Sequence, residues 1–98
     1  METVIKRPHG LKVKIVIRLA FAHYNGGSIL WESDVFVCKA GKRYWHPVAD
    51  TNSPEYKSLP LFGGERKQWI KLKQLQYVTE QELLSAKLKF WEKIKPKD

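Results

Sequence analysis

The sequence is poor in the residues on which disulfide-bonded and metal-bound folds depend. It holds a single cysteine, Cys38, which excludes an internal disulfide and leaves an apolar core to stabilise the fold. The cysteine and the three histidines follow no CxxC, HxH or HExxH spacing, so we predict no metal site and no cofactor. A chain without disulfides is typical of a reducing compartment, and we therefore expect a cytoplasmic, intracellular protein.

Long apolar runs are also missing. A membrane helix needs about 20 consecutive apolar residues. The most apolar stretch, residues 11–22, is interrupted by Lys12, Lys14 and Arg18. The first residues lack the apolar core and small-residue cleavage site of a signal peptide. We therefore expect a soluble protein without a membrane partner.

Recognisable catalytic motifs are absent. The chain has no GxSxG elbow, no P-loop and no dinucleotide-binding fingerprint. Cys38 follows an apolar strand pattern, where a lone cysteine is typical of a small packed hydrophobe. We therefore predict no catalytic residues and a protein that is not an enzyme. The enzymatic alternative is a small ribonuclease-like site built from Arg43, Tyr44 and His46.

Positive charge is what the sequence has in excess. Lys and Arg number 18 against 10 Asp and Glu, which gives a net charge of +8 and a pI near 9.7. A field of this sign attracts anionic partners and speeds their encounter with the protein. Nucleic acid and an acidic protein surface are the two partner classes that we carry forward. The oligomeric state does not follow from the sequence.

The length of 98 residues and the 43% hydrophobic content fit one globular domain. Pro8 and Gly10 break regular structure, so residues 1–10 are predicted to be a basic flexible arm before a single domain over residues 11–98. Period-two alternation of apolar residues predicts strands, with turns at Asn25-Gly26-Gly27 and around Gly41. The predicted strands are residues 11–24, 28–39, 43–48 and 68–72.

Two other segments complete the prediction. Residues 50–65 are dense in proline and glycine and predict a long, slightly acidic loop, which we expect to pack against the basic stretch 66–73. Residues 79–94 predict a helix, because Thr79 and Glu82 have capping-box spacing and Pro96 prevents a longer helix. The apolar side of this helix, which spans roughly 160°, is expected to bury against the sheet.

The order β-β-β-loop-β-α indicates an α+β fold. It is compatible with a small, strongly bent antiparallel sheet or with an SH3/OB-like barrel of four to five strands, closed in either case by one C-terminal helix. The sequence does not decide between the barrel and the open sheet.

Basic residues are interleaved with aromatic ones along the predicted strands. Lysine and arginine can hold phosphates while tryptophan stacks on bases, and the same residue types anchor protein interfaces. We expect Trp31 and Trp91 to lie in the core and Trp45 and Trp69 to be exposed. The predicted contact residues are Lys12, Lys14, Arg18, Lys42, Arg43, Trp45, Trp69, Lys71 and Lys73.

These observations predict a small, basic, non-catalytic binding module. The leading hypothesis is that one Lys/Arg and aromatic face of the sheet contacts nucleic acid without a strong sequence code. The alternative is a protein-interaction or inhibitor domain that docks on an acidic surface of a larger partner protein.

Overall fold

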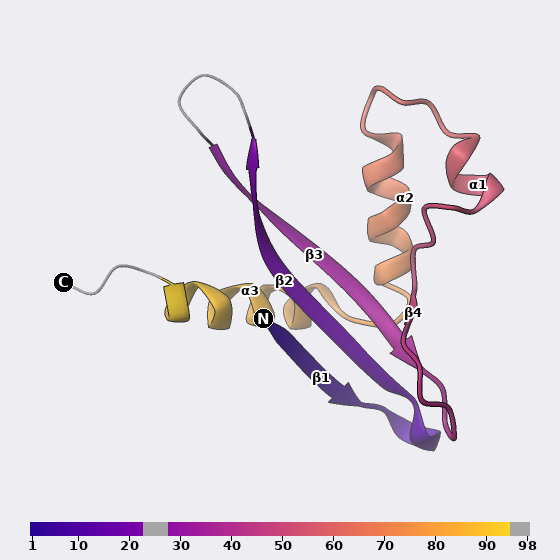
Figure 1. Ribbon diagram of the computed structural model, residues 1–98, viewed down its shortest axis with the longest axis vertical. Coiled ribbons are helices and arrows are strands. Elements are labelled where there is room, and N and C mark those ends of the chain that lie inside the picture. The colour runs from indigo at the N-terminus through magenta and orange to yellow at the C-terminus, as the bar shows by residue number, and fades with distance from the viewer. Residues whose placement is uncertain (23–27, 95–98) are drawn as a thin grey trace.

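The computed structural model describes residues 1–22 and 28–94 of the chain (Figure 1). The turn predicted at residues 25–27 and the helix-ending Pro96 lie outside the described residues. The elements in chain order are β1 (Glu2–Lys6), the 3-10 turn η1 (Pro8–Gly10), β2 (Lys12–Ala22), β3 (Ser28–Cys38), β4 (His46–Pro47), α1 (Pro54–Lys57), α2 (Glu65–Gln74) and α3 (Glu80–Ile94).

The four strands form one antiparallel sheet in the order β1-β2-β3-β4. β1 and β4 are its two edges, so the sheet is open and is not closed into a barrel. β4 has only two residues and includes Pro47, which has no N–H to donate to a ladder. The fold is thus α+β, with the predicted antiparallel sheet and C-terminal helix.

The core lies on one face of this sheet, between β2, β3 and α3. Val13, Ile15 and Ile17 alternate along β2 and are fully buried. The buried residues of β3 and of the α3 segment that pack with them are Val35, Val37, Val78, Leu83 and Ala86. Each fully buried aliphatic side chain of this size stabilises the fold by about 1.5–3 kcal/mol. Figure 1 shows α3 lying across the sheet near β2.

The predicted C-terminal helix is confirmed, together with its cap. The Thr79 N–H donates to Glu82 Oε1 at 2.9 Å, and the Glu82 N–H donates to Thr79 Oγ1 at 3.1 Å. These are the two reciprocal bonds of a capping box. The prediction that the whole apolar side of the helix is buried is wrong, because Leu84 and Leu88 are 51% and 55% exposed.

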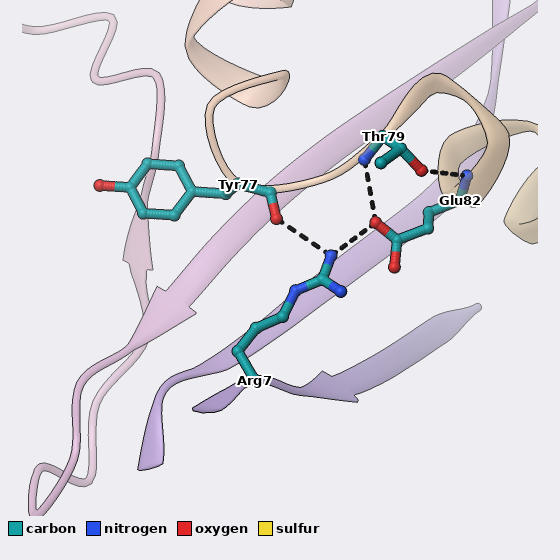
Figure 2. Close-up of polar contacts among 4 residues, drawn as sticks. All are labelled: Arg7, Tyr77, Thr79 and Glu82. Carbon is teal, nitrogen blue, oxygen red and sulfur yellow. Dashed lines mark hydrogen bonds and ion pairs between the residues drawn. The ribbon is translucent and has the colours of Figure 1, made fainter. Parts of the chain in front are cut away.

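A polar contact ties the start of the chain to this helix cap (Figure 2). Arg7 follows β1 directly, and its Nη2 donates both to Glu82 Oε1 and to the Tyr77 carbonyl oxygen, the latter at 3.1 Å. The hydrogen bond from Arg7 is the largest influence on Glu82 and lowers the pKa of its carboxyl. The N-terminal cap of α3 is therefore also the place where the segment that follows β1 is hydrogen-bonded to the helix.

The prediction of an arm over residues 1–10 is wrong. Residues 2–6 form β1, which pairs antiparallel with β2. The breakers that suggested an arm instead make the reversal between the two strands, where His9 and Gly10 take φ values of 63° and 78°. Thr3 and Ile5 alternate with exposed residues, and a strand this short has too few positions for its period to stand out.

The prediction of a fourth strand at residues 68–72 is also wrong, because these residues lie in α2. The segment is rich in Arg, Lys, Gln and Leu, which are good helix formers, and its buried residue Gln74 follows Ile70 by one helical turn. Leu72 lies within this helix and is 57% exposed. The predicted strand 43–48 is reduced to β4, and the predicted loop 50–65 contains the single turn α1.

Candidate functional site

The cations predicted on β2 project from the sheet face opposite the core, where two of the three meet carboxylates. Arg18 Nε lies 3.2 Å from Glu32 Oε2, and its Nη2 lies 2.9 Å from Asp34 Oδ2. Lys14 Nζ lies 3.7 Å from Glu2 Oε1. These charges are already partly compensated within the chain, so they attract a polyanion less than isolated cations would.

Lys14 also covers the aromatic residue that was expected to stack on a base. Its ammonium lies 4.7 Å from the centre of the Trp45 ring and 5.3 Å from that of Phe36, which are cation–π distances. Trp45 is therefore half-buried, and the prediction that it is exposed is wrong. One face of its ring has a partner from its own chain.

The predicted residues of α2 are similarly engaged. Lys71 Nζ lies 3.2 Å from Glu80 Oε1. Lys73 lies 4.0 Å from Glu55 and 5.5 Å from the ring centre of Trp69. The Glu55 contact is consistent with the expectation that residues 50–65 pack against the basic stretch.

Trp69 is half-buried rather than exposed, with its ring 5.4 Å from that of Tyr56. The core prediction for Trp91 is likewise wrong, since that side chain is 45% exposed. The side chain of Trp31 lies outside the described residues. In Figure 1, α2 stands on the β4 side of the sheet, away from β1. The nine predicted contact residues are thus not gathered on one surface.

A smaller group of cations does gather, at the end of the sheet where β1 stops and β2 begins. Lys6 and Lys12 are direct cross-strand partners, and Lys12 is also opposite Cys38 at the end of β3. All the members of the group are exposed, and no ion pair in the described ranges 1–22 and 28–94 involves any of them. We call this group the basic end; its members are Lys6, Lys12, Lys39, Lys42 and Arg43.

Two turns that touch each other hold the basic end together. A Cβ built on Gly10 would lie 2.8 Å from Ala40 Cβ, so the β1–β2 turn packs closely on the β3–β4 turn. The Cys38 thiol donates to the Lys42 carbonyl oxygen at 3.1 Å, and the Lys42 N–H donates to the Lys39 carbonyl oxygen at 3.0 Å. The β3–β4 turn is therefore held by its own hydrogen bonds and by its contact with the β1–β2 turn.

A shallow groove of about 450 Å³ adjoins these turns. Tyr44 is 62% exposed, and its ring stands edge-on to that of His46 at 5.5 Å between centres. Cations and aromatic rings, the combination expected for stacking against bases and holding phosphates, therefore occur together here. The groove is lined by Val37, Lys39, Lys42, Tyr44, His46, Pro47, Val48 and Tyr77.

Three of the nine predicted contact residues, Lys12, Lys42 and Arg43, belong to the basic end, and sequence reasoning missed Lys6 and Lys39. Lys6 was assigned to an arm, because the alternation of residues 2, 4 and 6 with Thr3 and Ile5 is too short to mark a strand. Arg43, Tyr44 and His46, which make up the enzymatic alternative, also lie in this region. Within the described residues, no three His, Cys, Asp or Glu side chains gather as metal ligands.

None of the helices that the structure describes has the length and apolar content to cross a bilayer. Comparison of the chain with protein-family models, with curated proteins and with solved structures finds no match in any of the three.

Proposed function

We propose that the basic end binds the backbone of a nucleic acid without reading its sequence. The observation that supports this function is the gathering of five exposed cations, without ion pairs in the described chain, on two turns in contact and on the strand ends beside them. Like charges held together raise the free energy of the unbound protein, and a polyanion relieves that repulsion while releasing its own counterions.

The chemistry of the group favours backbone contact over base readout. Four of its five cations are lysines, which act as mobile point charges, whereas base-specific contacts typically use the bidentate fork of arginine or an amide side chain. The exposed ring of Tyr44 and the neighbouring His46 can stack on an unpaired base whatever its identity. A single-stranded or locally opened ligand fits this arrangement.

The test is fluorescence anisotropy of labelled single-stranded and duplex DNA, and of RNA, at two salt concentrations. If the five cations each neutralise one phosphate of duplex DNA, the slope of log K against log salt is about −4.5, or about a 500-fold loss of affinity between about 50 and 200 mM salt. The double variant K42Q/R43Q removes two of the contacts, so the slope falls to about −2.7 and the loss to about 40-fold.

The matched control is K67Q/K89Q, which removes the same charge from exposed positions outside the basic end. It should retain the wild-type slope. Equal slopes for the two double variants would show that net charge alone drives binding and would remove the basic end as a site.

The acidic-protein alternative is separated in the same assay. If the protein binds none of the nucleic acids at low salt but binds polyglutamate through Lys42 and Arg43, the result supports a protein partner instead. Recovery of the RNA on a denaturing gel tests the enzymatic alternative, since cleavage that His46→Ala abolishes would support a ribonuclease.

A further inference from the structure

β1 is an edge strand whose outer hydrogen-bonding groups can be identified from the pairing on its inner side. Ile17 and Met1 exchange backbone hydrogen bonds of 2.9 Å, and the Arg7 N–H donates to the Leu11 carbonyl oxygen at 2.7 Å. Bonded and non-bonded pairs alternate along an antiparallel ladder. The N–H and C=O groups of Glu2, Val4 and Lys6 therefore point away from β2.

The side chains at the same three positions are also exposed. Glu2, Val4 and Lys6 lie on the sheet face opposite the core, and Val4 is 51% exposed, whereas Thr3 and Ile5 are half-buried. β1 thus presents outward backbone groups and an acid–apolar–base series of side chains at alternate residues.

We propose that β1 pairs antiparallel with β1 of a second copy of this chain, about a twofold axis at Val4. In this register the numbers of facing residues sum to eight. Val4 then faces Val4 of the partner, and Glu2 faces Lys6 at both ends. The three facing pairs use the N–H and C=O groups that point outward, with two backbone hydrogen bonds in each pair.

Charge selects this arrangement over the others. Opposite charges directly across an antiparallel pair stabilise it, and like charges destabilise it. A parallel pairing in register would place Glu2 against Glu2 and Lys6 against Lys6. A shift of two residues would place neither Glu2 nor Lys6 of either chain opposite a charge of the other sign. The antiparallel register centred on Val4 is the one in which both charges of both chains are matched.

The opposite edge of the sheet, formed by β3 and β4, is protected against pairing with another strand, whereas the β1 edge is not. Gln74 is buried, and its Nε2 donates to the Ser33 carbonyl oxygen at 2.9 Å along the outer side of β3. Pro47 removes a donor from β4. Proteins cover or block sheet edges where pairing is unwanted. In the described chain no strand pairs with the outer side of β1.

α3 carries exposed apolar side chains that the core does not use. Leu84 and Leu88, one turn apart on the helix, are 51% and 55% exposed. In Figure 1 the yellow C-terminal end of α3 projects past β1. A sheet continued by a second copy would extend into the region beyond β1.

The test is the mass in solution, measured by sedimentation equilibrium up to about 200 µM, with any tag placed after the last residue. The wild-type mass should rise from 11.5 kDa toward twice that value. E2K and K6E each place like charges opposite one another, so each alone should remain a monomer. Their equimolar mixture should form a mixed dimer, because one chain is then positive at both positions and the other negative.

The double exchange E2K/K6E restores complementarity and should dimerise like the wild type. E65K, a charge reversal at an exposed residue of α2, is the matched control and should not change the mass. Circular dichroism of each variant verifies that the fold is kept. A wild type that stays monomeric at the highest concentration overturns the proposal. So does a dimer that E2K and K6E leave intact, or a mixture of the two that does not associate.

Discussion

The contact between Arg7 and Glu82 joins residues 75 positions apart, and its removal should weaken the whole fold. In the folded chain Arg7 donates to the Glu82 carboxylate and to the Tyr77 carbonyl oxygen, and the same carboxylate oxygen accepts the Thr79 N–H. The perturbation is Arg7→Met, which keeps an unbranched side chain of similar length while removing every donor and the charge.

The magnitude follows from burial and from the number of bonds lost. The Arg7 and Glu82 side chains are 29% and 25% exposed, so the pair is screened less than a typical surface pair. One charge-assisted hydrogen bond and one bond to a carbonyl together contribute about 2 kcal/mol to the free energy of unfolding. For a domain of this size, such a loss lowers Tm by roughly 10 °C.

The dependence on pH has a definite sign. The Arg7 hydrogen bond lowers the pKa of Glu82 below its ordinary value of 4.5 in the folded state. Its contribution is therefore complete above the unfolded pKa and is lost as the pH falls through the folded one. The stability difference between wild type and Arg7→Met should be largest near neutral pH and should shrink in acid.

The assay is urea unfolding of a double-mutant cycle, with wild type, Arg7→Met, Glu82→Gln and the double variant, at about pH 7 and about pH 3. The coupling free energy should be about 1 kcal/mol at neutral pH and much smaller in acid. Arg43→Met, at an exposed arginine without an ion pair in the described chain, should change stability by less than about 0.5 kcal/mol. A coupling near zero at neutral pH, or one that is unchanged in acid, would refute the reasoning.

Three further predictions, tested with four substitutions, concern the turns, the sheet edge and the helix cap. Gly10→Ala should cost about 2–3 kcal/mol in urea unfolding, because its φ is +78° and its Cβ would meet the facing turn, whereas Gly41→Ala, with φ +76° and open space, should cost only about 1 kcal/mol; equal costs would contradict the close packing. Gln74→Met should cost about 1–2 kcal/mol, because the Ser33 carbonyl oxygen loses its donor; a neutral result would show that water replaces the amide. Thr79→Ala should lower Tm by roughly 5 °C through loss of the cap, and an unchanged Tm in differential scanning calorimetry would contradict this.

The best-predicted parts of the fold are those whose signals repeat over many residues. The alternation of Val13, Ile15 and Ile17 continues along a strand of 11 residues, so its period is unambiguous. The helix over residues 79–94 was predicted because its cap and its apolar periodicity agree, and the structure contains both.

The errors arise where a short segment satisfies two patterns at once. Residues 68–72 alternate as a strand would, yet they consist mostly of helix formers, and five positions are too few to separate the two periods. Pro8 and Gly10 were interpreted as signs of disorder because the sequence does not show that β2 has an unpaired side for residues 2–6 to occupy. That pairing is a tertiary property, which local patterns do not carry.

The candidate site was predicted in part for a similar reason. Lys12, Lys42 and Arg43 could be found from charge alone, but the carboxylates beside Arg18 and Lys71 come from other elements. Which cations stay unpaired depends on strand register and on the position of α2, neither of which the sequence specified. The five-residue basic end became visible only once the two turns were placed in contact.

The late position of α3 in the chain has a consequence for biosynthesis. The β2–β3 hairpin can form within microseconds of its synthesis, but Leu83 is added 66 residues after Ile17, roughly 3–13 s later at ordinary rates of translation. During that interval the aliphatic face of the nascent hairpin stays exposed to solvent or to a chaperone. Ribosome stalling before residue 79 would thus yield a truncated chain that is prone to aggregate, because the helix that covers its aliphatic face has not been synthesised.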